Sequence, residues 1–309
     1  MKTSIVDGAR FWALLIGIND YYADESLQLR GACADALAVY EYLTDNLHVP
    51  SGNINLFLTE SRRSKTAEAV ENAQSNTTHP TRETILNALY DLRDNPDIRR
   101  SDNILLYFAG RGSRYHASPL GVEALSPADR GCTPAGSSDL VHDISDRELS
   151  TIFQEIREAK GDCITVITDS CHTAGGEHGK GLRNVRHVMP LAGVDADLLL
   201  SVSHSRKRSA GSYASPTWDW DTSSCVPLSA TLTSGWAKEA KFDDSYHGYF
   251  TRALLALLKH KAHSSYYDLC QDMREYMPKS RTSSRPLQVP SAVGDRRHCA
   301  PWFIDRTQT

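Results

Sequence analysis

Runs of apolar residues that end abruptly in polar or glycine-rich segments recur along the chain, and they predict buried strands. Residues 11–17, FWALLIG, form a continuous apolar run bounded by Asn19 and Asp20. Such a run is expected for a strand that is covered on both faces. Residues 53–58, NINLFL, alternate instead, which also indicates a strand. The remaining expected strands are residues 104–108, 164–168, 197–202 and 302–304.

Apolar residues spaced three and four apart lie between these runs and predict amphipathic helices. Residues 81–94 carry such a stripe, and it follows Thr81, a suitable helix cap. The other expected helices are residues 37–47, 146–159, 247–259 and 265–277. The alternation of strand and helix predicts an α/β fold with a mostly parallel sheet and right-handed crossovers.

The 309 residues are expected to form a single domain, with a core at about residues 11–304. Hydrophobic residues make up 40% and charged residues 23% of the chain, which is ordinary for a globular protein. The formal net charge of -4 gives no reason to expect nucleic acid or an acidic membrane as a partner. Residues 205–246 are rich in Ser, Thr, Gly and Pro and exceed the usual loop length, so we predict a flexible or functional loop there.

Cysteine usage and the N-terminus favour a cytoplasmic location. Seven scattered cysteines without a CxxC pair fit reduced thiols better than a disulfide framework. The first residues lack the apolar core of a signal peptide, and no run approaches the ~18 apolar residues of a membrane span. We therefore expect a soluble protein of the cytoplasm.

Residues 164–176, ITVITDSCHTAGG, are the most informative segment for chemistry, because a β-branched apolar run ends there in Asp169, Ser170, Cys171 and His172. This pattern predicts Cys171 at the carboxyl edge of a buried strand. A thiolate nucleophile can be presented there, with main-chain N–H groups near a developing oxyanion. The alternative is an inert core cysteine.

Residues 103–114, NILLYFAGRGSR, form a second apolar strand that ends in a glycine-flanked loop. Together the two segments resemble the caspase-like cysteine peptidases, and metacaspases in particular. Members of that family carry a Gly-His-Gly-Ser loop and an Asp-x-Cys-His motif, and their His and Cys form the catalytic dyad. Here the loop reads Gly110, Arg111, Gly112, Ser113, so the resemblance places Arg111 at the position of the catalytic histidine.

The resemblance extends over about residues 11–304. Residues 16–19, IGIN, and 29–35, LRGACAD, are similar to the start of metacaspases, and residues 248–258 are similar to a helix found late in that family. The resemblance implies a three-layer caspase-like fold, in which helices cover both faces of a mostly parallel central sheet.

Arg111 changes the chemistry that the resemblance implies. A peptidase needs a group that takes the thiol proton and later gives one to the leaving amine. A guanidinium does neither, because it has no acceptor and stays protonated. Arg111 could still stabilise a Cys171 thiolate by its charge, or it could be a solvated surface residue. The candidate alternative bases are His116, in the same loop, and His172, beside the nucleophile.

The resemblance also implies how a substrate would be held. It assigns the oxyanion donors to the main-chain N–H groups of Cys171 and Gly112. It assigns Asp169 and Asp35 to a pocket for an Arg or Lys side chain, which two carboxylates suit by charge-assisted hydrogen bonds. Helix capping is the alternative role for Asp35.

If that pocket recognises basic residues, the run Arg206, Lys207 and Arg208 is a candidate for self-cleavage. A solvated basic loop is the alternative interpretation. In both cases the expected partners are protein or peptide segments with basic residues.

Many metacaspases require calcium, and the resemblance maps two of the aspartate ligands to Asp129 and Asp146. Arg147 stands where a second consecutive aspartate is usual, and an arginine repels a cation. We therefore expect a degraded calcium site and no required cofactor.

Two functions follow. The first is a metacaspase-like cysteine endopeptidase that favours Arg or Lys before the scissile bond, with activity weakened or lost through Arg111. The second is a catalytically dead pseudopeptidase that binds peptides, self-associates, or pairs with and regulates an active relative. Arg111 favours the second function, whereas Cys171 and the pocket acids favour the first.

Overall fold

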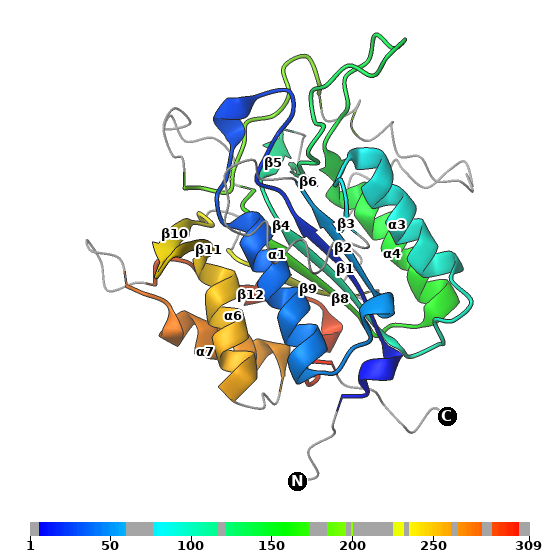
Figure 1. Ribbon diagram of the computed structural model, residues 1–309, viewed down its shortest axis with the longest axis vertical. Coiled ribbons are helices and arrows are strands. Elements are labelled where there is room, and N and C mark those ends of the chain that lie inside the picture. Colours follow the sequence, from blue (N-terminus) through cyan, green and yellow to red (C-terminus); the bar gives the residue numbers. More distant parts are fainter. Residues whose placement is uncertain are drawn as a thin grey trace.

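A seven-stranded sheet forms the centre of the protein (Figure 1), whose computed structural model describes residues 6–59, 77–116, 121–172, 184–195, 199, 225–231, 235–260, 265–279 and 286–302. Neighbouring strands are parallel except at one edge, where β12 is antiparallel to β9. In spatial order the strands are β12 (Ser291–Ala292), β9 (Val226–Ser229), β8 (Ile164–Asp169), β4 (Asn103–Ala109), β1 (Phe11–Gly17), β2 (Ile54–Leu58) and β3 (Thr77–Thr78).

Helices cover both faces of this sheet (Figure 1). The helices are α1 (Ala32–Glu41), α3 (Arg82–Asp94), α4 (Asp146–Lys160), α6 (Tyr249–His260) and α7 (Tyr266–Tyr276), with short turns η1 (Gly8–Arg10), η2 (Glu25–Leu27), η3 (Tyr42–Asn46), η4 (Ser51–Asn53) and η5 (Asp295–His298). Side chains of α1, α6 and α7 share one buried cluster, and those of α3 and α4 share another. The expected three-layer α/β architecture is therefore confirmed.

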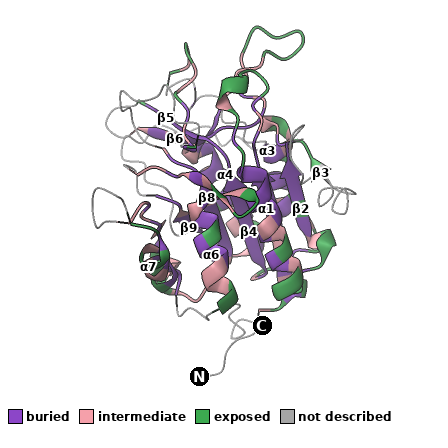
Figure 2. Ribbon diagram, turned by 60° about the vertical axis from the view of Figure 1, so that its left-hand side comes forward, coloured by how far each residue is buried: buried purple, intermediate pink, exposed green. Residues whose placement is uncertain are grey.

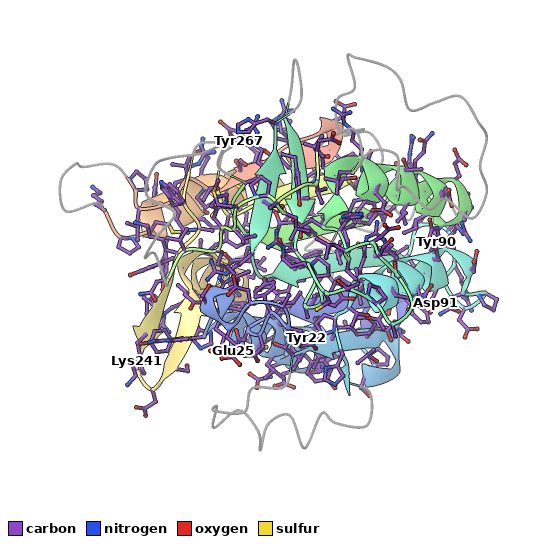
Figure 3. The ribbon with its side chains drawn as sticks, turned by 90° about the horizontal axis from the view of Figure 1, so that it is seen from above. Tyr22, Glu25, Tyr90, Asp91, Lys241 and Tyr267 are labelled. Carbon is purple, nitrogen blue, oxygen red and sulfur yellow. The ribbon has the colours of Figure 1, made fainter. Side chains whose placement is uncertain are left out.

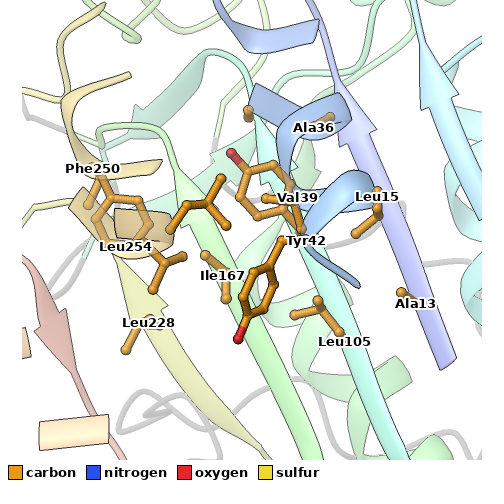
Figure 4. Close-up of a cluster of buried hydrophobic side chains, with 14 of the residues drawn as sticks. Ala13, Leu15, Ala36, Val39, Tyr42, Leu105, Ile167, Leu228, Phe250 and Leu254 are labelled. Atoms are coloured by element: carbon orange, nitrogen blue, oxygen red, sulfur yellow. The ribbon is translucent and has the colours of Figure 1, made fainter. Parts of the chain in front are cut away.

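The alternation of side chains along β1 explains why two layers of helices are needed. Leu15 belongs to the cluster with α1 and α6, whereas Leu14 and Ile16 belong to the cluster with α3 and α4. The central strands are buried along most of their length (Figure 2). Figure 4 shows the first cluster, where Phe250 and Leu254 of α6 meet Ile167 of β8.

Helix ends follow their capping residues. The Thr81 hydroxyl accepts the Thr84 N–H at 3.2 Å at the start of α3, and the Ser145 hydroxyl accepts the Glu148 N–H at 3.1 Å at the start of α4. The expected helices at residues 81–94, 146–159, 247–259 and 265–277 are present, with ends shifted by one or two residues. The helix expected at residues 37–47 begins earlier, at residue 32, and its last turn widens into the π-helical η3.

Two small antiparallel sheets flank the main one. The first contains β5 (Gly112–Tyr115), β6 (Val122–Leu125) and β7 (Ile144–Ser145), and the second is the hairpin of β10 (Glu239–Phe242) and β11 (Ser245–Gly248). No helix among the described residues is long and apolar enough to cross a membrane.

Three expectations about strands and loops differ from the structure at the residues that it describes. Of the strand expected at residues 197–202, only Leu199 lies within the described residues; it is helical and donates its N–H to the Asp195 oxygen at 3.2 Å. The strand that pairs with β8 on this side is β9. Of the strand expected at residues 302–304, only Trp302 lies within the described residues, and it is in a turn; the last described strand is β12. The predicted loop at residues 205–246 contains β9, β10 and the start of β11. Each of these strands is only four residues long, which is too short for a hydrophobic pattern to identify.

Candidate active site

Parallel pairing of β4 with β8 brings the two informative loops together. Ala109 pairs with Asp169 at the carboxyl ends of these strands, so residues 110–113 and 170–172 begin at the same edge of the sheet. The hairpin β10–β11 approaches the same edge of the sheet from a different side. Lys241 is the labelled residue of this hairpin in Figure 3. The sequence-predicted loops therefore meet at one site.

Cys171 is at this site but is fully buried, with 0% of its surface exposed. Burial raises the pKa of its thiol to about 12, and the nearby Arg111 and Arg186 charges offset this only in part. The thiol is therefore neutral near pH 7, and the expected stabilisation of a thiolate by Arg111 is outweighed by desolvation.

Arg111 is also buried, with 4% of its surface exposed, so the interpretation as a solvated surface charge is wrong. Its Nε donates to the Leu27 oxygen at 2.5 Å. Its Nη1 donates to the Val185 oxygen at 2.8 Å and to the His187 oxygen at 2.6 Å. Burial lowers the pKa of Arg111, but a guanidinium that donates to main-chain oxygens offers no acceptor for a thiol proton.

The two candidate alternative bases lie in different surroundings. His116 is exposed beyond the far end of β5, four residues from Gly112, which is about 13 Å along a strand. His172 lies beside Gly112, and its Nδ1 is 3.6 Å from the Glu123 carboxylate. Burial lowers the pKa of His172, which keeps its imidazole neutral.

Asp35 and Asp169 lie together in a buried acidic pocket, and Glu239 of β10 completes it. The occupant is the Arg186 side chain, which is 0% exposed. Its guanidinium nitrogens lie 2.5 Å from an Asp35 oxygen, 2.9 Å from an Asp169 oxygen and 3.6 Å from a Glu239 oxygen. Asp35 therefore takes part in an ion pair and is not the cap of α1.

The pocket wall orients these carboxylates. Thr251 donates its hydroxyl to the Asp169 carboxylate at 2.6 Å, and the Gly248 N–H donates to the Asp35 carboxylate at 2.8 Å. His247 Nδ1 lies 2.8 Å from the other Asp35 oxygen. Burial raises the pKa of Asp169 to about 6 although Arg186 acts in the opposite direction.

The main chain around Arg186 runs through the site as an extended segment, residues 184–188. On one side, the Arg186 N–H donates to the Ala237 oxygen at 2.9 Å. On the other side, the Val188 N–H donates to the Gly112 oxygen at 2.9 Å. The Arg186 oxygen accepts two N–H groups, from Cys171 and from Gly112, each at 3.1 Å. These are the two donors that the resemblance to caspase-like peptidases assigns to an oxyanion.

His187 follows Arg186 and is half-buried. Burial lowers its pKa, whereas hydrogen bonds with the Cys171 and Gly112 main chain raise it. The structure thus brings a second imidazole, besides that of His172, close to Cys171 and Gly112. The sequence analysis did not predict His187 there.

Glu239 and Arg186 were missed as well. Glu239 accepts hydrogen bonds from the N–H groups of Arg30 and Gly31 at 2.9 and 3.1 Å. No local sequence pattern predicts this role. The flanking Val185 and Val188 are the one local hint that Arg186 is buried.

The two aspartates that the resemblance maps to a calcium site accept hydrogen bonds from different main-chain donors. Asp129 accepts the Arg82 N–H at 2.8 Å, whereas Asp146 accepts the Arg147 N–H at 2.8 Å and its strongest charged neighbour is Glu123. Within the described part of the chain, no group of three His, Cys, Asp or Glu side chains could hold a metal ion. Arg206, Lys207 and Arg208 lie outside the described residues.

Comparisons with known proteins identify the family of the chain. Residues 10–304 match the caspase domain family. Metacaspase-4 of Arabidopsis thaliana is 27% identical over 166 residues, covering 53% of this chain and 33% of that protein. Metacaspase-1A of Aspergillus oryzae is 21% identical over 306 residues, covering 92% of this chain and 68% of that protein. The chain thus spans about a third of the first relative's length and two thirds of the second's.

Solved structures share the fold. A crystal structure of a Geobacter sulfurreducens protein has a TM-score of 0.57 at 15% identity, covering 96% of this chain and 99% of that chain. The Drosophila initiator caspase Dronc has a TM-score of 0.51 at 10% identity, covering 98% of this chain and 91% of that chain.

Proposed function

The chain belongs to the caspase domain family, and from that premise we propose that it is an arginine-recognising cysteine-peptidase domain whose hydrolytic activity is weak or lost. It would then act mainly by binding a protein or peptide segment. The observation that carries the proposal is Arg111, which stands at the family's histidine position and donates its guanidinium hydrogens to main-chain oxygens. Loss of a general acid and base typically costs roughly 10² to 10⁴ in rate.

The acidic pocket supports the proposed specificity. Three carboxylates, from Asp35, Asp169 and Glu239, converge on one guanidinium, whose planar N–H groups can reach more than one carboxylate. A lysine ammonium has the same charge but a less suitable shape, so we expect arginine to be preferred over lysine before the scissile bond.

The second candidate is an active endopeptidase with a different base. Two observations favour it: the Cys171 and Gly112 N–H groups converge on one oxygen, and the imidazoles of His172 and His187 lie nearby. Both imidazoles have lowered pKa values through burial, so each could accept a proton near neutral pH.

Hydrolysis of short peptides with Arg, Lys or Asp before a reporter group separates the two candidates. We expect the native chain to hydrolyse Arg reporters at or near the detection limit. Arg111→His should hydrolyse them at least about 100-fold faster than that rate or limit. Cys171→Ala is the control for the nucleophile, and added calcium tests the metal. Turnover by the native chain that is lost in Cys171→Ala would support the second candidate instead.

A further inference from the structure

We propose that residues 184–188 are a built-in ligand of the candidate active site and that Arg111 is the latch that keeps this ligand in place. The proposal rests on the proposed function for the identity of the site and adds how access to the site is controlled. Residues 184–188 have the sequence NVRHV, with Arg186 at the centre.

The segment is bound as a peptide ligand would be. Val185 pairs antiparallel with Lys238 on one side, and His187 pairs parallel with Gly112 on the other. Main-chain hydrogen bonds on both sides hold an added strand without regard to its side chains. The Arg186 side chain supplies the specificity, since it enters the acidic pocket.

The position of the Arg186 oxygen shows why this segment blocks chemistry. Both N–H groups that would hold a substrate oxyanion, from Cys171 and Gly112, already donate to this oxygen. Val185 and Val188 are buried on either side, and Cys171 beneath has no exposed surface. A substrate can therefore reach the thiol only after the segment has moved.

Arg111 joins the segment to the body of the domain. Its Nη1 donates to the oxygens of Val185 and His187, the two residues that flank Arg186. Its Nε donates to the Leu27 oxygen, in the region between β1 and α1. Hydrogen bonds from a charged donor are about twice as strong as neutral ones, so this bridge restrains the segment on both sides of the pocket.

The pocket selects what can replace the segment. Removal of Arg186 would leave Asp35, Asp169 and Glu239 buried without a cation, which is unfavourable. The displacing partner is therefore a chain segment with an arginine between small or apolar residues, similar to NVRHV itself. The site would remain closed until such a segment displaces residues 184–188 from the acidic pocket.

Alkylation of Cys171 by iodoacetamide, followed at each cysteine by peptide mass spectrometry on the folded full chain, tests the latch. We expect Cys171 in the native chain to react as slowly as the core residue Cys33, and Arg111→Ala to accelerate the reaction at Cys171 at least tenfold. A thiolate-stabilising role for Arg111 predicts the opposite, a slower reaction in Arg111→Ala. Arg252→Ala is the control, because Arg252 has a 44% exposed side chain.

Cys33, Cys225 and Cys270 report unfolding, because all three are buried. If they also react in Arg111→Ala, the second variant Arg186→Lys decides, since it keeps a cation but loses contacts in the pocket. Where the core cysteines of Arg111→Ala stay protected, this variant decides: a tenfold rise confined to Cys171 supports the latch, and no rise overturns it. Otherwise the same two outcomes are read from Arg186→Lys. Native Cys171 reacting tenfold faster than Cys33 also overturns the proposal.

The two proposals can fail separately. If alkylation accelerates but Arg111→His hydrolyses no reporter, the built-in ligand stands and the proposed cause of the lost activity falls. If Arg111→His hydrolyses Arg reporters but Arg111→Ala leaves Cys171 protected, the proposed function stands and the latch falls.

Discussion

Arg186 is the residue in which the acidic pocket, the thiol and the extended segment meet. A buried ion pair of this kind contributes little net stability compared with well-packed apolar residues, yet breaking it by removing one partner costs about 3–5 kcal/mol. Net stability therefore does not explain why Arg186 is buried here. Its contacts with Cys171 and with the acids of the pocket give the better explanation.

The carboxyl group of Asp146 tests how burial shifts the pKa of a single residue. Burial, aided by the Glu123 charge, raises the pKa of Asp146 to about 7 in the folded state, above its value of 3.8 in a model compound. The folded state therefore holds a proton that the unfolded state releases between pH 4 and 7. The free energy of unfolding contributed by this group falls as the pH rises through that window.

Asp146→Asn removes this penalty because its side chain is neutral at every pH. We expect the variant to be about 1–3 kcal/mol more stable than the native chain at pH 8 and nearly equal to it at pH 4. Urea unfolding at the two pH values measures the difference, with the exposed Asp97→Asn as control. A difference that is the same at both pH values would contradict the raised pKa.

At the residue scale the sequence could predict part of the site. Asp35, Asp169, Cys171 and Arg111 were identified from motifs, and the structure gathers all four. Glu239 and Arg186 were not identified, because their roles depend on pairing between segments about fifty residues apart, which no local pattern encodes.

The elements of the central sheet were the most predictable part of the fold. β1, β4 and β8 are continuous apolar runs that are buried on both faces, so the hydrophobic pattern alone identifies them. β9 and β10 were missed, since each is four residues long. Their position is fixed by contacts with β8 and with residues 184–188.

Gly248, at the junction of β11 and α6, tests how tightly these elements close the pocket. A Cβ atom there would overlap an Asp169 carboxylate oxygen and come within 2.8 Å of Arg186 Nη1. Gly248→Ala should therefore destabilise the fold by about 1–3 kcal/mol through overpacking. Chemical denaturation measures this loss.

Gly52→Ala is the matched control, because a Cβ atom at Gly52 has nothing within 4 Å. Its free energy of unfolding should stay within about 0.5 kcal/mol of the native value. Equal stability of Gly248→Ala and Gly52→Ala would show that the pocket is looser than the structure indicates.

At the scale of the whole molecule, the parallel sheet explains how distant segments form one site. β4 and β8 deliver Arg111 and Cys171 to the same edge, α1 contributes Asp35, and the hairpin β10–β11 contributes Glu239. Residues 184–188 then fill the space between these elements. We therefore propose that the candidate active site of this caspase domain is closed by the domain's own Arg186.

Hydrogen exchange on the native full chain tests this central claim most directly, because it needs no substitution. The N–H groups of Gly112, Cys171, Arg186 and Val188 all donate within or against the bound segment. We predict that each exchanges at least about 100-fold more slowly than in an unstructured chain. Exchange of these four amides at the unstructured rate would contradict the account, since the segment would then not occupy the site.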